Sequence, residues 1–175
     1  MRDDNCLPEN YPDGVTLYRN IPYNRFIEVL KKSYSEFNKF EDKVNKNQTF
    51  YNRNFWNGGE GADGEDLSPN ELMKEKINQH LIPIMPKLKG KKFSEPSLAS
   101  TTKRQNDEIS YYGNVKLIIK IKKEHVEKYL AVDVAKKGVR YNEEEVTLPP
   151  NQKFLIVSAE LVNEDQILRV ELESF

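Results

Sequence analysis

The sequence contains little cysteine, no long apolar run and no excess of either charge. A single cysteine among 175 residues, Cys6, excludes an internal disulfide and a zinc site built on several thiolates. No apolar run approaches the roughly 20 residues that span a bilayer. With 27 basic and 28 acidic residues, the chain lacks the basic excess typical of nucleic-acid binders. We therefore expect no membrane span and no nucleic-acid partner.

The N-terminus also lacks the apolar segment of a secretory signal, so we expect none in residues 1–6. The mean hydropathy of −0.77 describes a polar chain, but an aromatic content of 10% argues against disorder. A chain of 175 residues fits one domain that buries about two thirds of its unfolded surface. We expect a single domain over residues 1–175, with residues 1–14 as a lead-in, that can work in a reducing compartment.

Helix-like patterns dominate the first half of the chain. Residues 15–19 alternate and are rich in β-formers, which predicts a short strand ended by Pro22. From Arg25 to about Lys46, apolar residues recur every three or four positions, as on one face of a helix. This face, expected in the core, consists of Phe26, Leu30, Tyr34, Phe37, Phe40 and Val44. A second helix is predicted from Ser68 to about Leu81 by an N-cap, a proline and a glutamate in its first turn.

Strand-like segments dominate the second half. They cover residues 115–121, 129–134, 145–148, 153–159 and 166–172. Because helices come first and strands second, with one early strand, we predict an α+β fold. Its N-terminal helices are expected to pack on a two-sheet antiparallel β core.

The usual enzyme signatures are absent. His80 and His125 lack an H-E-x-x-H context or a cysteine partner, so we interpret both as solvated or capping residues. The glycine-rich acidic stretch at 57–64 lacks the G-K-[ST] of a P-loop and the spacing of a calcium loop. It is better interpreted as a flexible loop.

Three segments are unusual for purely structural ones. Arg19 ends an otherwise apolar strand, residues 97–102 form a hydroxyl cluster, and residues 141–150 place glutamates directly ahead of a strand. Strand alternation puts Glu143 and Glu145 on one face and Glu144 on the other. Like charges at adjacent same-face positions are costly unless solvent or a ligand stabilises them. Each segment alone is typical of a protein surface, so only the order and spacing of the three segments can indicate a function.

That order resembles the mono-ADP-ribosyltransferases of the R-S-E group. This group includes the enzymatic subunits of clostridial binary toxins, the Rho-modifying exoenzymes and vertebrate arginine-specific ecto-enzymes. The similarity extends from Leu17 to about Leu172 and is strongest over residues 114–158. Its elements are the aromatic-Arg pair Tyr18-Arg19, the S-T-S-like Ser100-Thr101-Thr102 and the Glu143-Glu144-Glu145 run before an apolar strand.

The chain also departs from the group's pattern. Leu98 stands where an aromatic residue often precedes S-T-S. The basic residue that often follows S-T-S falls on Asn114 or Val115. Residues 51–66 have no counterpart and are interpreted as a loop insertion.

The resemblance implies that NAD is the substrate and that no metal is needed. It implies NAD-binding roles for Arg19, Tyr18, Ser100, Thr101, Thr102 and Tyr112. The planar guanidinium of Arg19 suits a pyrophosphate, which it can hold with two parallel hydrogen bonds.

The same resemblance implies the catalytic roles. Glu145 would stabilise the oxocarbenium-like ribose that forms when nicotinamide leaves, and Ser100 would hold its rotamer. Glu143 would orient the acceptor and accept its proton. Tyr141, just ahead of the glutamates, would contact the protein substrate.

The resemblance further implies a bacterial toxin or effector that is secreted or injected and acts in the target-cell cytosol. A glutamate at position 143 resembles the arginine-modifying members, and a carboxylate suits a guanidinium acceptor. Actin is the favoured target on family frequency, with a small GTPase as another candidate. A delivery domain or an immunity protein would be a further partner. Two alternatives stay open: an NAD glycohydrolase that uses water, and an inactive interaction module on the same fold.

Overall fold

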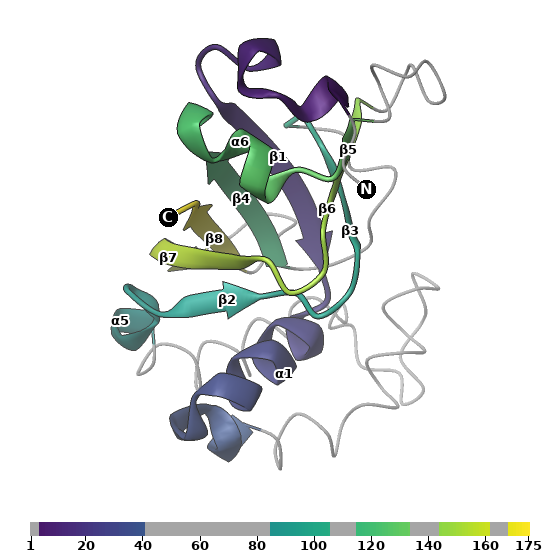
Figure 1. The fold of residues 1–175 in the computed structure, drawn as a ribbon. Coiled ribbons are helices and arrows are strands. Elements are labelled where there is room, and N and C mark those ends of the chain that lie inside the picture. The colour runs from purple at the N-terminus through teal and green to yellow at the C-terminus, as the bar shows by residue number, and fades with distance from the viewer. Residues whose placement is uncertain (1–3, 41–84, 106–114, 134–143, 162–167) are drawn as a thin grey trace, which may run out of the picture.

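The computed structural model describes residues 4–40, 85–105, 115–133, 144–161 and 168–175 (Figure 1). Its strands are β1 Val15–Ile21, β2 Lys92–Ser94, β3 Ala99–Thr102, β4 Val115–Ile121, β5 Val132–Asp133, β6 Glu145–Leu148, β7 Lys153–Leu161 and β8 Leu168–Glu173. Its helices are η1 Asp4–Cys6, η2 Pro8–Asn10, α1 Tyr23–Ser33, η3 Ser35–Phe40, α5 Met85–Leu88, η5 Lys123–His125 and α6 Val126–Tyr129. Within these ranges, no helix is long and apolar enough to cross a membrane.

The strands form one mixed sheet of eight, in the order β2-β7-β8-β4-β1-β3-β6-β5. Among the pairs of described strands, only that of β4 with β8 is parallel. The expected two antiparallel sheets are therefore not confirmed, because β1 pairs with β4 on one side and with β3 on the other. In Figure 1, β2 and β7 lie horizontally while β3 and β6 stand upright, as expected for the twist of a large sheet. Side-chain alternation predicts which face is buried, and not which strands are neighbours.

The core follows the alternation that the sequence predicts. The inward residues of β4 and β8 are all buried: Val115, Leu117, Ile119, Ile121, Leu168, Val170 and Leu172. Helix α1 buries Phe26 and Leu30, and the ring of Phe26 stacks on that of Phe93 in β2 at 5.4 Å between centroids. Each such side chain contributes about 1.5–3 kcal/mol relative to exposure.

The first helix is shorter than its periodicity predicts. It begins at Tyr23 and ends at Ser33, after which a 3-10 turn, η3, follows. Tyr34 adopts an extended conformation at the junction, and its hydroxyl accepts a hydrogen bond from the main-chain N–H of Lys92 at 2.8 Å. This tertiary contact outweighs the continuing apolar pattern, although Phe37 is buried as expected. Glu36 in η3 also accepts a hydrogen bond from Lys91, which lowers the pKa of Glu36 below its ordinary value.

Other predicted elements agree to different degrees. The strands at 115–121 and 145–148 are confirmed, as are most of those at 153–159 and 166–172. The strand expected at 129–134 is wrong at its start, because Tyr129 ends helix α6 and exchanges two hydrogen bonds with the main chain of Phe175. The second helix at 68–81, the loop at 57–64 and the insertion at 51–66 lie outside the described residues.

The described part of the expected lead-in, residues 4–14, packs against the sheet. Cys6 and Tyr11 are buried, and this purple segment lies beside β5 in Figure 1. Gly14 leads into β1 with a φ of +74°, where a β-carbon would overlap the carbonyl oxygen of Ile121 at the end of β4. Only glycine permits that approach without strain.

Candidate active site

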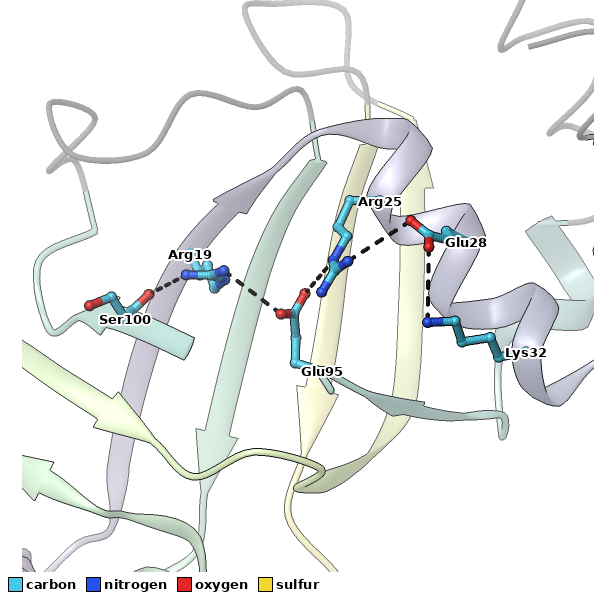
Figure 2. Close-up of polar contacts among 6 residues, drawn as sticks. All are labelled: Arg19, Arg25, Glu28, Lys32, Glu95 and Ser100. Carbon is cyan, nitrogen blue, oxygen red and sulfur yellow. Dashed lines mark hydrogen bonds and ion pairs between the residues drawn. The ribbon is translucent and has the colours of Figure 1, made fainter. Parts of the chain in front are cut away.

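Arg19 lies at the centre of the described part of the site. It occupies β1, opposite Leu117 of β4, and 18% of its side chain is exposed. Its Nη1 donates a hydrogen bond to the carbonyl oxygen of Ser100 at 2.8 Å (Figure 2). Its Nη2 lies 3.8 Å from Oε2 of Glu95. The guanidinium therefore joins β1 to β3 and to the segment between β2 and β3.

Glu95 is a site residue that sequence reasoning missed. Its carboxylate is buried, and Nε of Arg25 in α1 lies 3.8 Å from Oε1. Neither carboxylate oxygen has a hydrogen-bond partner within the described residues, so the charge is compensated by these two ion pairs. A buried carboxylate is tolerated only with such compensation. The one signal in the sequence was an acidic residue five positions ahead of Ser100, in a stretch without periodicity.

The ion pairs continue from Glu95 to the surface of α1. Nη1 of Arg25 lies 3.9 Å from Oε2 of Glu28, and Nζ of Lys32 lies 3.9 Å from Oε1 of Glu28 (Figure 2). Glu28 and Lys32 are exposed, so solvent screens their contribution. The inner part of this ion-pair network, in which Glu95 lies between Arg25 and Arg19, restricts the Arg19 side chain together with the Ser100 carbonyl.

Ser100 and Glu145 meet on adjacent strands. In the register of β3 and β6, Thr102 lies opposite Glu145 and Ser100 lies opposite Thr147. Ser100 is two residues from Thr102, so its side chain faces the same side as that of Glu145. The hydroxyl of Ser100 donates a hydrogen bond to Oε1 of Glu145, whose residue is only 8% exposed. This is the contact that the resemblance implied.

The two threonines have local hydrogen-bond partners. Thr101 is fully buried, and its hydroxyl donates to the carbonyl of Val146 at 2.6 Å. Thr102 accepts a hydrogen bond from the main-chain N–H of Arg104 at 3.1 Å. These hydrogen bonds support the pairing of β3 with β6 and the turn after β3, and the NAD-binding roles of both threonines stay predictions. Tyr18 lies opposite Thr102 across β1 and β3 and is partly exposed.

The remaining site residues fall partly outside the described chain. Tyr112, Tyr141 and Glu143 are not among the described residues, so their proposed roles keep the status of predictions. Glu144 is described: its φ is +47°, and its carbonyl accepts the N–H of Lys103 at 3.1 Å. Among the described residues, no group of three or more His, Cys, Asp or Glu side chains is placed to hold a metal.

Comparison with known proteins identifies the fold. No protein family and no curated protein matches the sequence. Among solved structures, the enzymatic component C2-I of the C2 toxin from Clostridium botulinum is similar over 93% of this chain, with a TM-score of 0.50 and 15% identity. The chain has the fold of this toxin component. This agrees, at the level of the fold, with the toxin enzymes that the motif order resembles.

Two further structures are similar. C3stau2 from S. aureus, solved with NAD, matches 94% of this chain at a TM-score of 0.49 and 15% identity. The ADP-ribosyltransferase HopU1 of Pseudomonas syringae pv. Tomato DC3000 matches 93% at 0.44 and 18% identity. The chain spans 32% of the length of C2-I, 63% of C3stau2 and 46% of HopU1. It is thus shorter than each of these proteins.

Proposed function

We propose that this chain is the catalytic domain of an NAD-dependent protein mono-ADP-ribosyltransferase. The observation that carries the proposal is that Ser100 contacts both Arg19 and Glu145. Its carbonyl accepts from Arg19 at 2.8 Å, and its hydroxyl donates to the carboxylate of Glu145. NAD has an anionic pyrophosphate, which a guanidinium such as that of Arg19 can bind. It also has a ribose that becomes cationic during cleavage, which a carboxylate such as that of Glu145 can stabilise.

Arg19 would bind the pyrophosphate of NAD. A guanidinium presents five N–H donors in a plane, so it can keep the Ser100 carbonyl and still offer donors to phosphate oxygens. Glu95 lies 3.8 Å from Nη2 and restrains the guanidinium from the opposite side to Ser100. The side chain is therefore held in one place before a ligand arrives, which lowers the entropy cost of binding.

Glu145 would stabilise the transition state of cleavage. The bond between the ribose C1′ and the nicotinamide nitrogen breaks, and its electron pair leaves with nicotinamide. The ribose then carries an oxocarbenium-like positive charge. The carboxylate of a residue that is only 8% exposed interacts with that charge more strongly than one in water. The hydrogen bond from Ser100 keeps Glu145 in place throughout the step.

The acceptor would be an arginine of a target protein. Under this proposal, Glu143 orients the acceptor guanidinium and takes its proton, and Tyr141 contacts the target. Actin is the favoured target, with a small GTPase as the other candidate. The chain would act as a secreted or injected bacterial toxin or effector in the target-cell cytosol, with a delivery domain or an immunity protein as a further partner. C2-I, described as the enzymatic component of a toxin, supports this setting.

An NAD glycohydrolase is the second candidate. Arg19, Ser100 and Glu145 would serve the cleavage of NAD in the roles proposed above, and cleavage is common to both activities. Transfer differs only in the acceptor, which Glu143 and Tyr141 would select. An inactive interaction module on this fold is the third candidate, and it would leave NAD intact.

Glu145→Gln tests the proposal directly. The amide keeps the shape and the acceptor for Ser100 but removes the charge that stabilises the ribose cation. We expect nicotinamide release and labelling of lysate proteins from labelled NAD to fall by about 100-fold or more. The melting temperature should stay close to that of the parent.

Glu171→Gln is the matched control, because Glu171 lies in β8 and pairs with Lys120. It should retain parental activity. Activity of Glu145→Gln within tenfold of the parent would contradict the assignment. Nicotinamide release by the parent without labelled protein would instead identify a glycohydrolase, and mass spectrometry of a labelled peptide would identify the acceptor.

A further inference from the structure

Three side chains from distant parts of the chain meet at the β5 edge of the sheet: Tyr11, Lys103 and Asp133. Asp133 is fully buried. The hydroxyl of Tyr11 donates a hydrogen bond to Oδ2 of Asp133, and Nζ of Lys103 lies 2.8 Å from the same oxygen. Lys103 Nζ also lies 5.4 Å from the centre of the Tyr11 ring. Because a buried carboxylate is costly without partners, this cluster holds its members firmly.

Lys103 connects this cluster to the candidate active site. Its side chain pairs with Asp133, while its main-chain N–H donates to the carbonyl of Glu144 at 3.1 Å. Glu144 has a φ of +47°, a region that residues other than glycine adopt only when their surroundings hold them there. The next residue is Glu145. Asp133 also lies opposite Val146 in the pairing of β5 with β6, so the cluster supports β6 from both sides of its start.

We propose that Tyr11, Lys103 and Asp133 form an edge latch that positions the turn at Glu144 and, through it, the carboxylate of Glu145. The latch rests on the proposed function only in the role given to Glu145. Its members are positioning residues, since the latch reaches Glu145 through the hydrogen bond from the Lys103 N–H to the Glu144 carbonyl and through the pairing of Asp133 with Val146. They do not include Arg19, which contacts Ser100 and Glu95. The latch therefore acts on the chemical step and not on NAD affinity.

Tyr11→Phe tests the latch by removing one hydroxyl and keeping the ring. Two measurements report on it: the hydrogen-exchange rate of the Lys103 amide, and kcat and KM for NAD in nicotinamide release. We expect the Lys103 amide to exchange about three- to tenfold faster, as the loss of one buried hydrogen bond predicts. We expect kcat to fall by a similar factor with KM within about twofold of the parent.

Tyr34→Phe is the matched control. Tyr34 directly follows α1, and its hydroxyl accepts a hydrogen bond from the main-chain N–H of Lys92 in β2, away from the latch. Both the Lys103 exchange rate and kcat should stay at the parental values in this variant. A merely structural role for Tyr11 would lower stability without separating kcat from KM.

Asp133→Asn is the second variant and should repeat the pattern, because the amide removes the charge that holds Lys103. Parental exchange and kcat in both variants would overturn the proposal, as would a raised KM with unchanged kcat. If the parent turns over NAD, faster exchange of the Lys103 amide with an unchanged kcat in the variants would also overturn the proposal. A parent without NAD turnover would refute the proposed function instead. The exchange rate of Lys103 would then decide by itself whether the latch holds the turn.

Discussion

At the scale of single residues, Ser100 has the most consequential position. Its carbonyl and its hydroxyl contact a cation and an anion on two different neighbouring strands. The motif order predicted that Ser100 would hold Glu145. It did not predict the contact with Arg19, because a main-chain carbonyl leaves no mark in a sequence. The two residues that would bind NAD and stabilise its ribose are thus coupled through one short strand.

Arg19→Lys should weaken NAD binding while the fold is kept. An ammonium is a point charge on a flexible stem and cannot reproduce a planar fork that serves Ser100, Glu95 and a phosphate together. We expect the Kd for NAD to rise by about tenfold or more, measured by isothermal titration calorimetry. Arg169→Lys, at an exposed position of β8, should leave the Kd unchanged. An unchanged Kd for Arg19→Lys would place the pyrophosphate elsewhere.

At the scale of elements, β1 lies in the middle of the sheet, between β4 and β3. It pairs with β4 over its whole length, from Val15 to Ile21, and with β3 through Tyr18. The turn ahead of β1 must therefore bring the chain in close to the end of β4. Gly14 makes this possible, with a φ of +74° and no room for a β-carbon beside the Ile121 carbonyl.

Gly14→Ala should destabilise the domain more than a glycine substitution in open space. We expect a loss of about 2–4 kcal/mol, from strain at positive φ together with the clash against main chain. Gly90→Ala is the matched control, because Gly90 has a φ of +85° but no atom within 4 Å of a β-carbon. It should cost about 1 kcal/mol. Urea denaturation measures both, and an equal loss in the two variants would contradict the steric argument.

At the scale of the whole molecule, the eight described strands form one sheet, in which β4 and β8 are the single parallel pair. The α+β class and most C-terminal strands could be predicted because each strand carries its own alternation. The sheet order could not be predicted, since hydrogen bonding between strands leaves no local pattern. The same limit applies to Glu95, whose partners Arg19 and Arg25 reach it only after the sheet and α1 are assembled.

Ligand stabilisation tests the function of the intact domain. A ligand that binds only the folded state adds about 2.7 kcal/mol at 100 times its Kd. For a chain of 175 residues, that corresponds to a rise in melting temperature of about 5–10 °C. We expect NAD to produce this rise in a thermal-shift titration and nicotinamide alone to produce little. No shift at millimolar NAD would favour the inactive interaction module.

The sequence by itself determined the buried faces of the strands, the α+β class and the order in which Arg19, Ser100 and Glu145 occur. These properties depend on residue type and short-range spacing, so they are present before the chain folds. The tertiary structure alone decided that Ser100 lies between Arg19 and Glu145, that Glu95 lies between two arginines, and that Tyr11 reaches Asp133. Each of these contacts joins segments far apart in the chain, and only the strand order brings them together.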